Sequence, residues 1–157
     1  AAMYFYFQNA TIYGADINPD MFKYRSNRIE SLYVDSGSRE LINANILEKN
    51  ISYKIIIEDA SHTLKDQILS LFILFKVLEP GGVFIIEEID FPEKREDMRI
   101  NQSQPDLKQI LNNILLNKDF NSEYINKDEK EYFLNHYYSI EFFTGNFNET
   151  VVIKKRS

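Results

Sequence analysis

One stretch, from Tyr53 to Asp90, constrains the fold more than any other part of the sequence. It contains two short runs of β-branched and aromatic residues, 53–57 and 83–86, with an amphipathic segment between them. Acidic residues follow each run directly. This order is typical of a strand, a crossover helix and a second strand parallel to the first, with both acidic ends at one edge of the sheet. Ligands bind at this edge in open α/β sheets, so we predict the functional site there.

The alternation of strand and helix continues on both sides of this stretch. Helices are predicted at 1–7, near Met21, and at 39–49, 64–78 and 105–115, and further strands at 10–16, 29–34, 138–144 and 149–155. We expect a mobile loop over the site edge at 93–104 and assign no element to 117–130. This order predicts one doubly wound α/β domain over residues 1–157, with a mostly parallel sheet, helices on both faces and a C-terminal antiparallel hairpin.

Composition excludes several classes of protein. With 44% hydrophobic residues in 157, the chain can bury one core. The net charge is −6 and the basic residues are scattered, which argues against a nucleic-acid partner. No apolar run approaches the roughly 20 residues of a membrane span. The sequence has no cysteine, which excludes disulfides and fits a reducing compartment, so we expect a cytoplasmic protein and leave a homo-oligomer open.

Acidic side chains stand where four predicted strands end. They are Asp16, Asp35, Asp59 and the pair Glu87-Glu88. The carboxyl ends of parallel strands share one edge, so these carboxylates would repel one another unless some bind hydroxyl groups and others hold a divalent cation. Each acid taken alone is equally well explained as a loop residue that caps a helix or faces water.

The first two acids indicate a nucleoside. In nucleotide-binding α/β folds an acid at the end of such a strand accepts hydrogen bonds from ribose hydroxyls, which suits Asp16. Asp35 lies one strand further out, beside Ser36, where it could reach a base such as adenine. Together they suggest an adenosine-containing cofactor.

His62 follows Asp59 by three residues, in the turn that leaves a buried strand. A neutral imidazole there can take a proton from a hydroxyl near physiological pH. The alternative is that His62 only caps the next helix, whereas His136 is expected to be structural or at the surface. The oxygens of Asp59, Glu87 and Glu88 would suit Mg²⁺, Mn²⁺ or Ca²⁺, and a metal beside this histidine suggests removal of a proton from a substrate hydroxyl.

These motifs resemble class I S-adenosylmethionine-dependent methyltransferases, which have a Rossmann-like fold. The run Glu58-Asp59-Ala60-Ser61-His62 is similar to an Asp-Asp-Gly-Ser-His strand end, and 79–88 to a Lys-Pro-Gly-Gly turn and a strand ending Ile-Glu-Asp. This pattern is most similar to the branch with macrocin- and mycinamicin-type sugar O-methyltransferases and cephalosporin-hydroxylase-like proteins. Residues 9–17 and 33–38 resemble its second strand and its adenine-side turn.

The resemblance implies an O-methyltransferase for a hydroxyl of a sugar or another small polyhydroxylated acceptor. By carry-over, the residues that bind S-adenosylmethionine are Asp16, Ile17, Asp35, Ser36 and Asp59. The expected metal is a divalent ion, Mg²⁺, with Asp59, Glu87 and Glu88 as its ligands. The general base is His62.

The sequence departs from the family pattern in three places. Ala60 replaces a glycine and Glu88 replaces an aspartate. The glycine-rich loop after the first strand is missing, so we expect an N-terminally truncated domain without that strand and loop. Two alternatives stay open: a non-catalytic domain of the same fold used for binding or association, and a nicotinamide-dependent enzyme on a similar sheet.

Overall fold

The strands form two sheets in the computed structural model, which describes residues 2–18, 20, 23, 25–99 and 104–157. In chain order the elements are α1 (Ala2–Tyr6), β1 (Ile12–Asp16), β2 (Ile29–Tyr33), α2 (Arg39–Asn45), the 3₁₀ helix η2 (Leu47–Lys49), β3 (Tyr53–Glu58), α3 (Leu64–Leu74), the 3₁₀ helix η3 (Phe75–Val77), β4 (Leu78–Ile86), α4 (Phe91–Lys94), the 3₁₀ helix η4 (Glu96–Met98), α5 (Leu107–Asn117), α6 (Lys127–His136), β5 (Tyr137–Thr144) and β6 (Glu149–Lys155).

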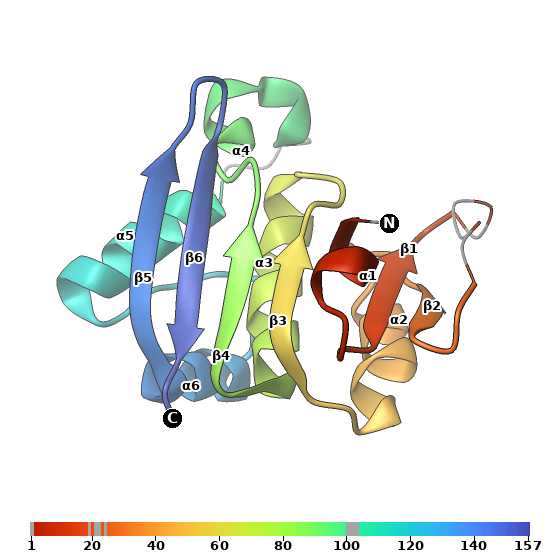
Figure 1. The fold of residues 1–157 in the computed structure, drawn as a ribbon. Coiled ribbons are helices and arrows are strands. Elements are labelled where there is room, and N and C mark those ends of the chain that lie inside the picture. Colours follow the sequence, from red (N-terminus) through yellow and green to blue (C-terminus); the bar gives the residue numbers. More distant parts are fainter. Residues whose placement is uncertain (1, 19, 21–22, 24, 100–103) are drawn as a thin grey trace.

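Strand direction confirms the predicted fold class. Strands β1 and β2 pair in parallel, and the larger sheet has the order β3-β4-β6-β5, with β3 and β4 parallel and β6 antiparallel to both neighbours. Figure 1 shows α2, α3, α5 and α6 on one side of the strands and α1 on the other. The chain is therefore an α/β fold with a C-terminal antiparallel hairpin, and β1, β3 and β4 point toward the same edge.

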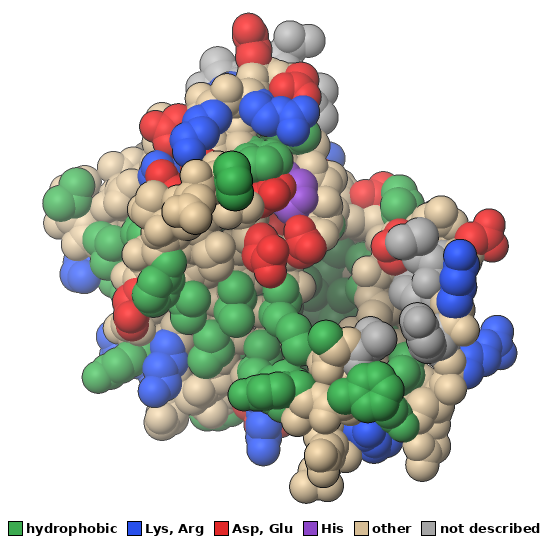
Figure 2. Space-filling view, turned by 45° about the horizontal axis from the view of Figure 1, so that its top comes forward, with side chains coloured by type: hydrophobic (Ala, Val, Ile, Leu, Met, Phe, Trp, Pro, Cys, Tyr) green, Lys and Arg blue, Asp and Glu red, His purple; other side chains and the backbone are tan. Residues whose placement is uncertain are grey.

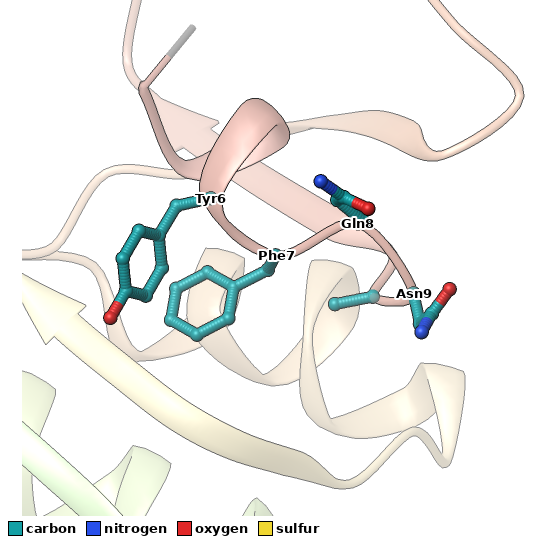
Figure 3. Close-up of a pocket in the computed structure, with 5 residues that line it drawn as sticks. Tyr6, Phe7, Gln8 and Asn9 are labelled. Carbon is teal, nitrogen blue, oxygen red and sulfur yellow. The ribbon is translucent and has the colours of Figure 1, made fainter.

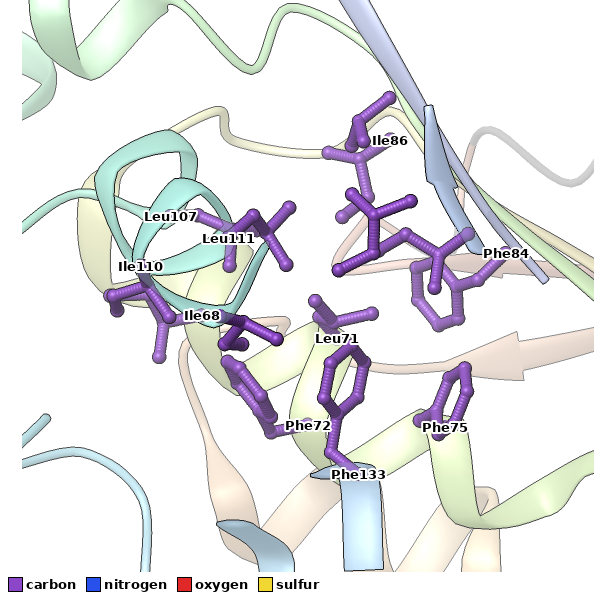
Figure 4. Close-up of a cluster of buried hydrophobic side chains, with 14 of the residues drawn as sticks. Ile68, Leu71, Phe72, Phe75, Phe84, Ile86, Leu107, Ile110, Leu111 and Phe133 are labelled. Atoms are coloured by element: carbon purple, nitrogen blue, oxygen red, sulfur yellow. The ribbon is translucent and has the colours of Figure 1, made fainter. Parts of the chain in front are cut away.

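The main core lies between the larger sheet and the helices behind it. Aromatic rings from α3, β4 and α6 are fully buried there, among them Phe72, Phe84 and Phe133 (Figure 4). Helix α3 packs into this core because its apolar residues recur at helical spacing, and Thr63 caps its first turn by accepting from the amide of Asp66. Gln67 of this helix also bonds the chain at the end of β4, where the site is found.

A second cluster joins the two sheets through helices. Leu32 and Val34, at the end of β2, pack with Ile42 of α2 and with Leu69 and Ile73 of α3. The edges of β1 and β3 that face each other have no strand partner among the described strands. A ring contact between Tyr13 and Tyr53, with centroids 5.3 Å apart, crosses this interval. The relative position of the two sheets thus depends on side-chain packing.

A hollow of about 470 Å³ opens beside this interval, at the connection from α1 to β1. Its lining is the run 6–10, and Figure 3 shows the rings of Tyr6 and Phe7 on the side toward β3.

Several predicted boundaries were wrong. Strand β4 begins at Leu78, not at Val83, because Leu78 pairs with Tyr53 before a bulge in the register. Helix α6 occupies part of the stretch left unassigned. The predicted loop at 93–104 contains the end of α4 and η4, and its residues 100–103, like the helix predicted near Met21, lie outside the described residues. No helix in the described part of the chain is long and apolar enough to cross a bilayer.

Candidate active site

Carboxylates gather around a histidine at the edge where the parallel strands end. Figure 2 shows this acidic group above a hollow with apolar side chains in its wall. The histidine is His62, in the loop between β3 and α3. The predicted convergence of Asp59, His62 and Glu88 is therefore present in the structure.

His62 is held between two acids. Its Nε2 lies 3.2 Å from Glu88 Oε2 and 3.5 Å from Asp59 Oδ1. The side chain is 16% exposed, and its ring meets the ring of Phe91 with centroids 5.5 Å apart. Nδ1 is buried without a hydrogen-bond partner in the described part of the chain. The two carboxylates therefore hold one nitrogen of the imidazole in place at the strand-end edge.

The backbone at both contact residues is in the left-handed region. His62 has φ of 56° and Glu88 has φ of 54°. This conformation costs a non-glycine residue on the order of 1 kcal/mol, so the surroundings must impose it. The amide of Phe91 and Nε2 of Gln67 both donate to the carbonyl of Glu88, at 3.0 and 3.2 Å. These bonds fix the chain where it leaves β4.

Glu58 is a buried acid at this edge, with 5% of its surface exposed. Burial is the main cause that raises its pKa to about 7, although the hydrogen bond from the amide of Ala60 opposes the rise. The charges of Asp59, Asp66 and Glu87 raise it further. Oε2 has no hydrogen-bond partner among the described residues. Glu58 is therefore partly protonated near neutral pH.

The predicted cofactor residues of the smaller sheet bond within their own loops. Asp16 Oδ1 accepts from the amide of Asn18 at 2.7 Å, and Asp35 Oδ1 accepts from the amide of Gly37 at 2.8 Å. Ile17 is 57% exposed and Ser36 is half-buried. Both acids thus serve as turn formers here, with one carboxylate oxygen of each not engaged in these bonds.

The three proposed metal ligands do not come together. Asp59 and Glu88 meet at His62, whereas Glu87 is linked to β3 through its amide, which donates to the carbonyl of Glu58 at 3.0 Å. Among the described residues no group of three or more His, Cys, Asp or Glu side chains is arranged to hold an ion. The residues as placed do not fit a three-carboxylate site, and the magnesium assignment stays a prediction.

The family is decided by comparison with known proteins. A family model described as a methyltransferase domain matches residues 2–142. The chain belongs to this methyltransferase family. A comparison with curated proteins gives no match.

Solved structures agree with this methyltransferase fold. MycE, a methyltransferase from the mycinamycin biosynthetic pathway solved in complex with Mg and SAH, aligns with a TM-score of 0.70 at 19% identity over 93% of this chain. The chain spans 37% of the length of MycE. A Streptococcus mutans protein solved in complex with SAH aligns with a TM-score of 0.51 at 11% identity, over 92% of this chain and 76% of its own. At such identities the likeness shows the fold alone.

Two residues that contact the candidate site were not predicted. Gln67 is fully buried and donates to the carbonyl of Glu88, just after β4. Asn148, in the turn between β5 and β6, donates to Glu88 Oε1 at 3.2 Å. Gln67 is a polar residue within the apolar pattern of α3, which was an available signal. Asn148 carried none, since a Gly/Asn turn is explained by hairpin geometry alone.

Proposed function

We propose that the chain carries the acid–base part of an S-adenosylmethionine-dependent O-methyltransferase that acts on a hydroxyl of a sugar or another small polyhydroxylated acceptor. The observation that supports this most is the position of His62 between Asp59 and Glu88 at the strand-end edge. One of the solved MycE structures contains Mg, SAH and Mycinamycin VI, which supports a small-molecule acceptor.

The reaction needs a proton to leave the acceptor as its oxygen attacks. S-adenosylmethionine, when bound, would supply a sulfonium methyl group to the acceptor oxygen, and the products would be a methyl ether and S-adenosylhomocysteine. His62 would take the hydroxyl proton, and the carboxylates of Asp59 and Glu88 would orient its ring. Alignment of oxygen and methyl carbon supplies the remaining acceleration.

Cofactor contacts are proposed at both sheets. Asp16 and Ile17 would bind the ribose, Asp35 and Ser36 the adenine side, and Asp59 the side nearest the acceptor. The carboxylate oxygens of Asp16 and Asp35 that are not used in their turns can accept from hydroxyl or amino groups.

The test uses the complete gene product that contains these residues. Titration calorimetry should detect S-adenosylhomocysteine, with and without Mg²⁺, and H62A should abolish methylation of a sugar acceptor panel while keeping cofactor affinity. H136A is the matched control, because His136 lies on α6 and bonds the carbonyl of Tyr132 at 2.7 Å. Full activity in H62A would refute the proposed base.

The alternative is a non-catalytic domain of the methyltransferase fold that serves binding or association. Exposed Ile55 and Ile57 on β3 are the observation that favours it. Absence of cofactor binding, together with self-association that depends on these side chains, would support this alternative.

A further inference from the structure

The turn between β5 and β6 is fastened to the active-site edge. The amide of Ile89 donates to the carbonyl of Glu149 at 3.0 Å, and the amide of Glu149 donates to Asp90 Oδ1 at 2.8 Å. The turn closes on itself where the amide of Gly145 donates to the carbonyl of Asn148 at 2.8 Å. The backbone at Asn148 is thus fixed relative to the segment that follows β4.

From this fixed backbone the side chain of Asn148 reaches Glu88. Its Nδ2 donates to Oε1 at 3.2 Å, whereas the other carboxylate oxygen, Oε2, lies 3.2 Å from His62 Nε2. The carboxylate is planar, so a donor that holds one oxygen also limits where the second can point. The amide is the suitable group because its NH₂ donates, whereas an aspartate would repel Glu88.

The contact is not needed to form the turn. Closure of the turn uses the backbone carbonyl of Asn148, not its amide group. Asn146, two residues earlier in the same turn, is exposed and its side chain makes no hydrogen bond in the described part of the chain. Hairpin geometry therefore accounts for an asparagine at either position but not for the bond to Glu88.

We propose that Asn148 is a positioning residue of the active site. It holds Glu88 so that one oxygen stays against His62, and it thereby makes the C-terminal hairpin a part of the acid–base machinery. Its effect on turnover rests on the proposed function, whereas its effect on the His62 ring does not.

The first experiment is spectroscopic and needs no substrate. The ring nitrogens and carbon-bound protons of the two histidines are recorded by NMR in the unmodified protein and in N148A, N148D and N146A. N148A removes the donor to Glu88, and N148D replaces it with a carboxylate that repels Glu88, so the His62 resonances should move in both variants. The His136 resonances serve as an internal reference and should stay in place, and N146A should match the unmodified protein at both histidines.

The second experiment separates positioning from folding. N148Q keeps an amide donor, so its His62 resonances should lie closer to those of the unmodified protein than the resonances of N148A do. A purely structural role would not produce this partial return. In a methylation assay N148A should lower kcat about tenfold, the scale of a modest misplacement of reacting groups, with KM within about twofold.

Two outcomes overturn the inference. His62 resonances that are the same in N148A, N148D and the unmodified protein would show that Asn148 does not position Glu88. Equal His62 shifts in N146A and N148A would assign the effect to the turn as a whole. Absence of methylation in every variant, with the His62 shifts as expected, would refute the proposed activity and leave the positioning role intact.

Discussion

Gln67 reaches from the first turns of α3 to the backbone of Glu88, with 3.2 Å between its Nε2 and the carbonyl oxygen. It also lies 3.5 Å from the carbonyl of Glu87. A buried helix side chain thus holds the segment that leaves β4.

We expect Q67L to lower the free energy of unfolding by about 1–3 kcal/mol, because it removes a fully buried donor from the part-buried carbonyls of Glu87 and Glu88. Urea unfolding measures this, and the exposed Gln8, changed to leucine, is the control. If Q67L is as stable as the unmodified protein, other donors hold Glu88.

The pH dependence of stability should report on Glu58. Its pKa is raised to about 7 from the ordinary value of 4.5 for a glutamate. A raised carboxyl pKa means that the folded state binds the proton more tightly, so this contribution is fully present below pH 4.5 and is lost as the pH rises through 7. The loss amounts to about 3 kcal/mol.

The substitution E58Q should remove this contribution to the pH slope and stabilise the protein at pH 8, because the amide carries no charge. Urea unfolding at pH 5, 6, 7 and 8 gives the comparison, with E48Q at an exposed glutamate as control. A slope that is unchanged in E58Q would place the titrating group elsewhere.

A buried ammonium closes the opposite end of the sheet. Lys155 Nζ donates to the carbonyls of Leu78 at 2.6 Å and Phe75 at 3.1 Å and to the hydroxyl of Tyr132 at 2.7 Å. K155M should cost about 2–4 kcal/mol, since it leaves these acceptors unpaired where η3 meets β4. Thermal unfolding checks this against K154M, whose lysine is exposed on the same strand. Equal melting temperatures for the two variants would contradict the prediction.

Gly37 leaves room for Asp66. A Cβ at Gly37 would lie 2.6 Å from Asp66 Oδ1, whose other oxygen accepts from Ser61 at 2.5 Å. We expect G37A to destabilise the protein by about 1–3 kcal/mol and to weaken cofactor binding, because the carboxylate of Asp66 or the turn at Asp35 must shift. In a double-mutant cycle, D66A should reduce the cost of G37A by more than about 0.5 kcal/mol. Strict additivity would argue against this contact.

The sequence predicts the strands of this fold because they form short runs rich in β-branched residues that end in polar residues. It does not predict α6, whose only buried residues are Glu129 and Phe133. That helix depends on its capping box with Asn126 and on the ion pair of Glu129 with Arg39, which lies 90 residues earlier.

The same distinction applies to the site. Asp59 and His62 are close in sequence, and Glu88 ends the neighbouring strand, so topology alone brings them together. Asn148 lies 60 residues beyond Glu88, and only the register of β6 against β4 brings it there. Glu87 was grouped with Glu88 because the two are adjacent, yet its amide bonds to Glu58 and only Glu88 meets His62.

The facing edges of β1 and β3 have a mechanical consequence. The half of the molecule with Asp16 and Asp35 is coupled to the half with Asp59 and His62 through the packing of α2 against α3, without a continuous backbone ladder between the described strands. Side-chain contacts deform more easily than a ladder of hydrogen bonds. The distance between the two sheets should therefore change more easily than the distances between paired strands. An extended segment inserted there would bond to both strands at once and would fix how far a nucleoside at one half stands from a hydroxyl at the other.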